Sequence, residues 1–515
     1  MSENSVVNSK RIAKNTIMLY VRMLITMVVS LYTSRVVLEV LGVDDFGIYN
    51  VVGGIVIVLS FLNSSMATST QRFLNFELGT NNSEGAKQVF STAILLHVLI
   101  GLVITLLAFT IGTYFLEYKM NIDSERMLAS RYVFVFSVLT FVFQTITVPY
   151  NSIIIAHERM SAYAYLSIVE VILKLLIVYL IKVIDADHLI VYALLSFIVS
   201  VLIRVAYIIY SKYNFEEAVF ARKFIDRQKF KQMFGFSSWS IVGNLGYILH
   251  TQGISIVTNI YFNTAINAAQ GIANQVNSAV TSFTTNFQVA LNPQIVKSYA
   301  AKELEAMHQL IFRGCKFSYF LVLIFTVPII VETPQILNMW LTTIPPDTII
   351  FVRLILIVTL INSFSNIMAV AQGATGNVKT YQIVLTSIGL LHIPLAMVFF
   401  ELNFPAYYAT VVYIFLSLIL MATRILFVAK SVSIKLSVFL KEVCFPTFLA
   451  SIVAFIPAIA FHKLIPDTLL GFLLSCVISI ICVLLAIYFI GLNGCERYFI
   501  LNYCYKFFRK NCNHE

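Results

Sequence analysis

Residues 469–492 read LLGFLLSCVISIICVLLAIYFIGL, an apolar run without one charged side chain. A helix rises about 1.5 Å per residue, so this run is long enough to cross the roughly 30 Å hydrocarbon core of a bilayer. The strands of a transmembrane barrel are shorter and alternate apolar with polar residues. The stretch therefore predicts a transmembrane helix.

The same pattern recurs along the chain. Hydrophobic residues make up 59% of the sequence, charged residues 12%, and the mean hydropathy is +0.86. About one quarter of a soluble domain is charged. The sequence therefore predicts an all-α integral membrane protein with about fourteen transmembrane helices. The expected spans are 15–38, 46–74, 88–116, 127–150, 160–183, 189–210, 233–260, 266–291, 311–331, 349–371, 381–400, 407–428, 443–462 and 469–492.

Lysine and arginine predict the orientation, because cytoplasmic loops are enriched in these residues. With the N-terminus in the cytoplasm, most of the 35 basic residues fall on that side, many of them in the loop 211–232. An even number of spans returns the C-terminus to the same side, and we expect the tail 496–515 to lie along the cytoplasmic interface. The net charge of +10 then needs no nucleic-acid partner. The polar start, MSENSVVNSKRIAKN, precedes a first apolar run without a cleavage site, so we expect the first helix to be retained.

Motifs typical of enzymes are missing from the sequence. It contains no Walker, HExxH or GxSxG motif, and the predicted external loops are too short for a catalytic domain. The seven cysteines form no CxxC pair, which predicts ordinary thiols without metal or disulfide roles. We therefore expect neither an enzyme nor a cofactor.

A weak internal repeat predicts two lobes. Residues 46–92 align with 264–310 and bring Gly53 opposite Gly271, and each half begins with a helix, a tight turn and a helix rich in Ser, Thr and Asn. Both halves would enter from the cytoplasm, so the expected fold is two six-helix lobes in a parallel pseudo-twofold repeat plus two extra C-terminal helices. The expected domains are an N-lobe of residues 1–215, a C-lobe of 216–428, and a segment of 429–515 with the last two helices and the tail.

Residues 271–294, GIANQVNSAVTSFTTNFQVALNPQ, crowd amides and hydroxyls into a predicted span. On a helix they fall in one arc, opposite apolar side chains. Facing lipid would cost several kcal/mol for each unpaired group, so the stripe must face other helices or water. It either bonds neighbouring helices or lines a hydrated cavity, and we favour the cavity because the stripe extends over about five turns. The candidate residues are Asn274, Ser278, Thr281, Thr285, Gln288 and Asn292, and in the equivalent helix of the first half Asn63, Thr68 and Arg72.

Charged side chains within spans are candidate functional groups. Arg22 lies in the first span and either faces a cavity or extends to the cytoplasmic interface. Lys174 lies in the fifth span, four residues after Glu170, a spacing at which the two can pair along one face. That pair either serves a cavity or only pins helices.

Other ionisable residues have ordinary explanations. Arg204 and Arg424 lie near predicted cytoplasmic ends and are expected to extend toward the interface. His97, His250 and His392 are expected to be isolated histidines with satisfied hydrogen bonds. The predicted seventh, eighth, tenth and eleventh helices contain no Asp or Glu, which favours an anionic or sugar-bearing cargo over a cationic one.

Residues 35–49, RVVLEVLGVDDFGIY, resemble the R…LG…(F/Y)GxY pattern that ends the first helix and opens the second in Wzx-type polysaccharide-biosynthesis flippases. These belong to the multidrug/oligosaccharidyl-lipid/polysaccharide (MOP) exporter superfamily, together with the MATE exporters. NPQ at 292–294, followed by Lys297, Ser298 and Tyr299, resembles the end of that family's eighth helix, and QGATGN at 372–377 the turn after its tenth. The resemblance covers the whole chain in length, helix count and charge layout.

The resemblance implies a MATE-like fold and a flippase for O-antigen, capsule or exopolysaccharide biosynthesis. Such a protein moves an oligosaccharide linked to undecaprenyl pyrophosphate across a bacterial inner membrane, from the cytoplasmic to the outer leaflet, by alternating access. The implied partners are this lipid-linked oligosaccharide, membrane lipids and other polysaccharide assembly proteins. Arg22 and Lys174 would bind the pyrophosphate and the polar stripes the sugars. Relatives often place basic residues in the second lobe too, whereas the predicted seventh and eighth helices here carry none, so anion binding is expected mainly in the first lobe or with help from Arg353.

The sequence is compatible with two energy sources for transport. A coupling ion, H⁺ or Na⁺, could use Glu170, and the membrane potential could act on a charged cargo. The alternative function is a MATE-like cation-coupled multidrug antiporter, which would be expected to need a membrane carboxylate. A polysaccharide polymerase or ligase would require a large external loop, and no such loop is predicted.

Overall fold

The computed structural model describes residues 3–58, 60–118, 124–262, 264–341, 344–464, 466, 468–494 and 496–498. Helices contain most of these residues, and none of them lies in a strand. The predicted interfacial tail lies largely outside the described residues. The helices are α1 (Glu3–Val58), α2 (Ser60–Gly79), α3 (Ser83–Leu107), α4 (Thr113–Tyr118), α5 (Met127–Ala156), α6 (Met160–Ile181), α7 (His188–Asn214), α8 (Arg227–Tyr261), α9 (Thr264–Ala300), α10 (Leu304–Val331), α11 (Thr333–Trp340), α12 (Thr348–Asn362), α13 (Ser365–Ala374), α14 (Lys379–Leu390), α15 (His392–Glu401), α16 (Tyr408–Ser431), α17 (Leu436–Phe439), α18 (Phe445–His462) and α19 (Leu469–Ala486), with short π-helical or 3₁₀ turns at η1 (Ala108–Gly112), η2 (Arg222–Phe224), η3 (Leu440–Cys444) and η4 (Ile487–Gly491).

Every predicted span overlaps helical structure. The first two spans both fall on α1, which is broken at Gly42, where φ is 78° and ψ is 173°. Positive φ is accessible to glycine at little cost because it has no Cβ. The break lies between residue 38, where the first predicted span ends, and residue 46, where the second begins. The second predicted span continues into α2.

Ten segments of the described chain are long and apolar enough to cross a membrane. They lie in α3–α4, α5, α6, α7, α10, α12–α13, α14–α15, α16, α17–α18 and α19–η4. The protein is therefore a multi-pass membrane protein. The remaining predicted spans fall in α1, α2, α8 and α9 and are not among these ten, so the total of about fourteen stays a prediction.

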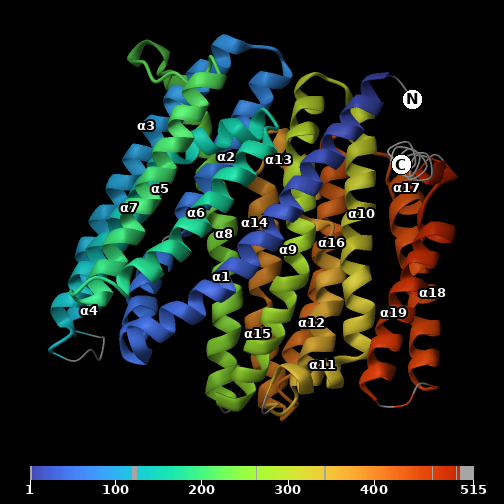
Figure 1. Cartoon of the computed structure of the whole chain (residues 1–515). Coiled ribbons are helices and arrows are strands. Elements are labelled where there is room, and N and C mark those ends of the chain that lie inside the picture. Colours follow the sequence, from blue (N-terminus) through green and yellow to red (C-terminus); the bar gives the residue numbers. More distant parts are fainter. Residues whose placement is uncertain are drawn as a thin grey trace, which may run out of the picture. The chain divides into compact units, whose positions relative to one another are not determined.

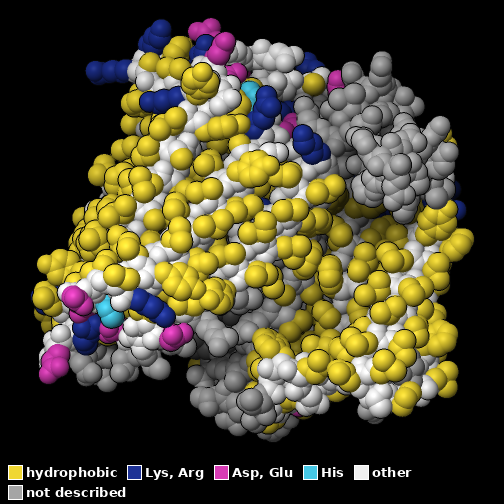
Figure 2. Space-filling model, viewed as in Figure 1, with side chains coloured by type: hydrophobic (Ala, Val, Ile, Leu, Met, Phe, Trp, Pro, Cys, Tyr) yellow, Lys and Arg dark blue, Asp and Glu magenta, His cyan; other side chains and the backbone are white. Residues whose placement is uncertain are grey.

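Apolar side chains dominate the outer surface of the helices. Large hydrophobic residues are exposed along most of the long helices, for example Leu106 on α3 and Phe415 on α16. On the face in Figure 2 they form a broad surface, while Lys, Arg, Asp and Glu gather near helix ends. Soluble monomers rarely expose apolar patches larger than a few hundred Å². Such a surface fits lipid contact.

The chain forms two compact units by its internal packing. The first contains Met1–Leu245, Val289–Glu303 and Gly376–Gln382, and the second contains Gly246–Gln288, Leu304–Thr375 and Ile383–Glu515. These units are defined by packing, whereas the predicted lobes are defined by a six-helix repeat. The lobe boundaries at 215 and 428 therefore remain a prediction.

The first unit is built around α2, α3, α5, α6 and α7. Helix α5 packs between α3 and α7, and these helices run side by side in Figure 1. Phe90, Ile153 and Tyr207 are among the fully buried side chains of this core. This packing positions α1 and α6, which carry Arg22 and Lys174.

The second unit packs α10 against α12, α18 and α19, and α18 and α19 run together at the C-terminal end of the chain (Figure 1). Lys316 on α10 donates a hydrogen bond of 2.7 Å to Glu496, and both side chains are buried. Removing one partner of such a buried ion pair would leave an unpaired charge. The pair therefore joins the segment after α19 to the rest of this unit.

Two membrane-spanning segments that lie wholly or mostly in the second unit are interrupted. The span Thr348–Ala374 is divided into α12 and α13 at Ser363 and Phe364, and the span Lys379–Glu401 into α14 and α15 at Leu391. Interrupted helices within a membrane occur where the backbone is buried in protein or lines a cavity. Both interruptions border the pocket described next.

Candidate functional site

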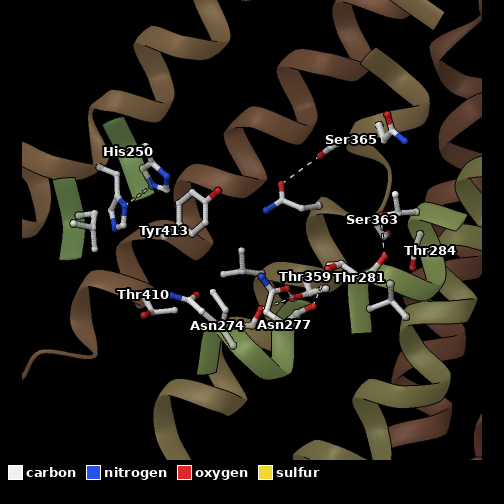
Figure 3. Close-up of a pocket in the computed structure, with 18 of the residues that line it drawn as sticks. His250, Asn274, Asn277, Thr281, Thr284, Thr359, Ser363, Ser365, Thr410 and Tyr413 are labelled. Carbon is white, nitrogen blue, oxygen red and sulfur yellow. Dashed lines mark hydrogen bonds between the residues drawn. The ribbon is translucent and has the colours of Figure 1, made fainter. Parts of the chain in front are cut away.

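A cavity of about 370 Å³ lies within the second unit. Its walls come mainly from α9, α12, α13 and α16, with His250 and Ile254 from α8, Val322 from α10 and His392 from α15. Figure 3 shows amide and hydroxyl side chains gathered around this space. Polar side chains thus gather at a cavity inside a unit whose outer surface is apolar.

Helix α9 supplies a long polar wall. Asn274, Thr281, Thr285 and Gln288 line the cavity along it. The Thr281 hydroxyl donates to the Asn277 carbonyl over 2.8 Å, and the Thr285 hydroxyl donates to the Thr281 carbonyl over 2.9 Å. Because these donors are used within the helix, the hydroxyl oxygens remain able to accept hydrogen bonds.

Two amides of α9 also hold neighbouring helices. Gln288 donates to the Ser318 hydroxyl over 3.0 Å and to the Ser363 carbonyl over 3.1 Å, and its oxygen accepts from Asn366 over 2.8 Å. Asn277 accepts from Thr359 over 2.6 Å, as Figure 3 shows. Gln288 and Asn277 therefore bond α10, α12 and α13 and also line the cavity.

The interruption between α12 and α13 brings a cation to the cavity. Arg424 on α16 donates to the Ser365 hydroxyl over 2.7 Å, and both residues line the cavity. The sequence predicts that Arg424 extends toward the interface, and the structure instead places it against this polar wall. Among the described lining residues, Arg424 is the only one with a permanent charge. Arg353, the cation expected to help here, donates instead to the Ile330 carbonyl over 3.1 Å.

Two histidines predicted to be isolated form a pair. His250 Nε2 lies 2.7 Å from His392 Nδ1, and His392 Nε2 lies 2.8 Å from the Ala409 carbonyl oxygen. The Tyr413 ring lies against both imidazoles, with centroids 4.6 Å and 5.0 Å away. The expectation of satisfied hydrogen bonds holds for His392, but the expectation of isolation is wrong, because residues 142 positions apart meet across α8 and α15. His97 bonds within its own helix, to the Ala93 carbonyl over 2.8 Å.

In the first unit, Glu170 joins two cations. Lys174 donates to it over 2.8 Å along α6, the spacing that the sequence predicts, and Arg204 on α7 donates to it over 3.4 Å. The Lys174 side chain is 41% exposed and that of Arg204 11%, so Arg204 is the more sheltered partner. Glu170 therefore links α6 to α7, and Lys174 keeps accessible surface.

Arg22 lies over the Tyr163 ring, 4.6 Å from its centroid. Tyr163 and Lys174 are about three turns apart on α6. Arg22 and Lys174 are thus not side by side, so a pyrophosphate held by both would have to bridge that separation.

The polar residues of α2 lie in different surroundings. Thr68 is exposed and donates to the Ser64 carbonyl over 3.0 Å, and Asn63 is half-buried. Asn244 on α8 donates to the Ser65 hydroxyl over 2.7 Å, so this stripe also joins helices. Arg72 lies over the Phe73 ring, 4.4 Å from its centroid.

A glycine makes room for Arg72. A Cβ added at Gly376, where φ is +79°, would lie 2.8 Å from an Arg72 guanidinium nitrogen. Any side chain at this position would meet both the positive φ and the guanidinium. Gly376 belongs to the QGATGN turn that carries the family resemblance.

The remaining predicted residues are placed outside the cavity lining. Ser278 is exposed on α9 and is not among the lining residues. Asn292 is half-buried and belongs to the first unit. The cavity therefore receives only part of the predicted stripe.

Sequence reasoning missed Asn277 on α9 and much of the opposite wall. The missed residues of that wall are Thr359, Asn362, Ser363, Ser365, Asn366, Thr410, Tyr413 and Arg424. One available signal was NSFSN at 362–366, a polar cluster inside an otherwise apolar span. Polar residues within a span face other helices or a cavity.

No group of three or more His, Cys, Asp or Glu residues in the described part of the chain could hold a metal ion. Cys315, Cys444, Cys476 and Cys482 are free thiols. The arrangement in both units provides hydrogen-bonding groups and fixed cations, which suit binding of a polar or anionic molecule.

The comparisons with known proteins agree on the fold. An outward-facing structure of a multidrug resistance MATE family transporter of the MOP superfamily has a TM-score of 0.73 at 14% identity, covering 83% of this chain and 96% of that one. A MOP superfamily transporter from Pyrococcus furiosus, described by the reverse polarity of its binding pocket, has a TM-score of 0.72 at 13% identity with the same coverage. MATE in the straight conformation has a TM-score of 0.72 at 13% identity, again covering 83% and 96%. At such identities the likeness shows the fold alone.

The sequence itself matches a family. No curated protein sequence matches the chain significantly. The family model described as polysaccharide biosynthesis protein matches residues 12–298, which is more than half of the 515 residues. The chain therefore belongs to the polysaccharide biosynthesis protein family and has the MATE-like fold of MOP-superfamily transporters.

Proposed function

We propose that this protein flips an oligosaccharide linked to undecaprenyl pyrophosphate from the cytoplasmic to the outer leaflet of a bacterial inner membrane. The observation that carries the proposal is the cavity of α9, α12, α13 and α16, which is lined by amides and hydroxyls within an apolar, multi-pass protein. Membership of a polysaccharide biosynthesis family supports a glycan as the cargo. Both termini would lie in the cytoplasm, as the charge distribution predicts.

The chemistry of the cavity suits sugars. Sugar hydroxyls donate and accept hydrogen bonds, and the Asn, Gln, Ser and Thr side chains of the lining can do both. A volume of about 370 Å³ is near the lower end of the range for small-molecule pockets. The cavity would therefore hold part of an oligosaccharide at a time, and the remaining sugars would bind elsewhere along the path.

The charge of the lining suits an anion. Arg424 is always ionised and presents a planar guanidinium, which can bind phosphate or carboxylate oxygens through paired hydrogen bonds. Lys174, Arg22 and Arg72 in the first unit are further candidates for the pyrophosphate. Alternating access would then move the cargo between leaflets, with the cations neutralising it during the passage.

The rival function is a MATE-like multidrug antiporter for cations. The fold is compatible with it, but the described lining residues of the cavity include Arg424 and neither Asp nor Glu. A cationic drug in a low-dielectric cavity would need an opposite charge. The observed charge therefore favours the anionic glycan.

The direct test is a leaflet assay. The gene is deleted in its host, and surface-accessible lipid-linked oligosaccharide is labelled on intact spheroplasts that carry wild-type protein, no protein, or a variant with Asn274→Leu, Thr281→Val and Thr285→Val. We expect the glycan to accumulate on the cytoplasmic face without the protein and with the variant. Gln288 is left unchanged because it holds neighbouring helices.

The matched control is Thr423→Val on α16. Its hydroxyl donates to the Ile419 carbonyl of the same helix over 2.8 Å, as that of Thr281 does in α9, but Thr423 is not a lining residue. It should complement like the wild type. If the glycan reaches the outer leaflet equally well without the protein, the flippase proposal is wrong for that cargo.

A further inference from the structure

The His250–His392 pair stands in the wall of the cavity of the second unit. His250 comes from α8 and His392 is the first residue of α15, directly after the interruption at Leu391. Both side chains are buried, at 7% and 3% exposure, and both line the cavity. Two imidazoles at a cavity wall form a site that the sequence does not reveal.

The hydrogen bonds fix the proton positions. The Ala409 carbonyl can only accept, so His392 Nε2 carries a hydrogen and donates to it over 2.8 Å. In neutral His392 the lone pair is then on Nδ1, which accepts from His250 Nε2 over 2.7 Å. Neutral His250 consequently carries its own lone pair on Nδ1, and a further proton would bind there.

A positive charge at a buried site needs stabilising partners. Once His250 is protonated, its Nε2–H···Nδ1 bond to His392 becomes charge-assisted, and such bonds are roughly twice as strong as neutral ones. The Tyr413 ring, within 5.0 Å of both imidazole centroids, can add a cation–π contribution. The pair and the ring together therefore provide a place for one shared proton.

The charged surroundings are those of the cavity. From α16, Tyr413 and Arg424 face the cavity, and the described lining residues of α9 and α12 carry no charge. Glu401 at the end of α15 accepts from Tyr261 at the end of α8 over 3.1 Å. Arg424 is thus the permanently charged side chain among the described lining residues of this cavity. Its positive charge opposes protonation of the histidine pair unless an anion is bound between Arg424 and the pair.

A metal ion does not explain the pair. Zinc bridging two imidazoles would lie about 2.0–2.1 Å from each nitrogen, and the two nitrogens here are only 2.7 Å apart. The separation is that of a hydrogen bond.

We propose that the His250–His392 pair is a proton-binding site whose occupation is linked to binding of an anionic cargo in the cavity. The linkage rests on the proposed transport function. An anion bound at Arg424 offsets the repulsion between the guanidinium and the protonated pair. Because such linkage is reciprocal, protonation of the pair also strengthens anion binding. The proton would then bind together with the cargo.

The first test needs no cargo. The full chain is prepared in lipid nanodiscs with ring-labelled histidine, and its NMR signals are followed from acid to alkaline pH. His250→Gln and His392→Gln assign the two signals. We expect the His250 and His392 signals of the wild type to move together with one midpoint.

The linkage is tested with added inorganic pyrophosphate as the probe. It should move the common midpoint of the pair to higher pH in the wild type and not in Arg424→Gln. If neither signal moves between acid and alkaline pH, or if pyrophosphate leaves the midpoint of the wild type unchanged, the proposal is overturned.

Flipping is measured separately in the leaflet assay as a function of pH. Wild type should show a pH dependence that His250→Gln and His392→Gln lose. A titrating pair in a protein that flips no glycan would overturn the proposed function and keep the proton site. Flipping with unchanged pH dependence in both variants would overturn the proton linkage and keep the flippase.

Discussion

Arg424 and Ser365 are joined by a hydrogen bond of 2.7 Å between a guanidinium nitrogen and a hydroxyl. Ser365 is the first residue of α13, directly after the interruption of the membrane-spanning segment. The bond thus links α16 to the interruption and holds the cation at the cavity. It also indicates why a fixed charge is tolerated inside this unit, since the guanidinium has polar partners.

The first prediction concerns this cation. Arg424→Gln keeps hydrogen-bonding capacity toward Ser365 but removes the charge, so binding of an anionic cargo should weaken. Hydrogen bonds to charged groups contribute about 1.5–3 kcal/mol, so we expect flipping in the leaflet assay to fall about tenfold or more. Lys430→Gln removes the same charge from an exposed position on the same helix and should behave like the wild type. Equal loss in both variants would show that the effect comes from net charge and not from the cavity.

The second prediction separates the two roles of the α9 stripe. Gln288→Leu leaves the Asn366 amide and the Ser318 hydroxyl without their partner. A buried polar group left unsatisfied costs about 1–3 kcal/mol, so the thermal unfolding midpoint in detergent should fall. Thr285→Val removes an exposed hydroxyl that bonds only to its own helix and should leave that midpoint nearly unchanged. A large loss of stability in Thr285→Val would contradict the assignment of Thr285 to the cavity face.

These residues also show how far the sequence leads. Asn274, Thr281, Thr285 and Gln288 lie along one cavity wall, and a helical period predicts that they share a face, although Ser278 of the same predicted stripe does not line the cavity. The pairing of Glu170 with Lys174 follows in the same way from a spacing of four residues. Local periodicity is therefore readable from one sequence.

Contacts between distant segments are not readable in this way. His250 meets His392 across 142 residues, and Arg424 meets Ser365 across 59. Nothing in the local pattern of either residue identifies its partner, because the packing of whole helices decides which faces meet. The sequence thus predicts a polar stripe on α9 but not the wall that faces it.

The third prediction concerns Glu170. Glu170→Gln leaves Arg204, whose side chain is 11% exposed, without its carboxylate. An uncompensated, largely buried charge is destabilising, so the unfolding midpoint should fall. Lys174→Gln removes a partner that is 41% exposed and should change stability little. If Lys174→Gln nevertheless abolishes flipping, Lys174 contacts the cargo; if Glu170→Gln is as stable as the wild type, Glu170 does not pin α6 to α7.

The fourth prediction is that the contribution of Asp187, at the start of α7 in the first unit, to the stability of the fold depends on pH. Asp187 caps α7 by accepting from the backbone amides of Leu189 and Ile190 over 3.0 and 3.1 Å, and Arg126 donates to it over 2.6 Å. Burial alone would raise the pKa of Asp187, but the Arg126 guanidinium and these amides outweigh burial and lower the pKa below its usual value. Arg126 also pairs with Asp45, so one side chain joins α1, α5 and α7.

Because the folded protein lowers this pKa, the carboxylate stabilises the fold above the unfolded pKa of about 3.9, and the contribution is lost as the pH falls through the folded pKa. Asp187→Asn should therefore unfold at a lower temperature than the wild type at pH 6, and the difference should shrink as the pH is lowered below about 4. Glu216→Gln, at a site outside this cluster, should show no such convergence. A constant difference between Asp187→Asn and the wild type across this pH range would mean that the charge of Asp187 does not stabilise the fold and that its side chain acts only through neutral hydrogen bonds.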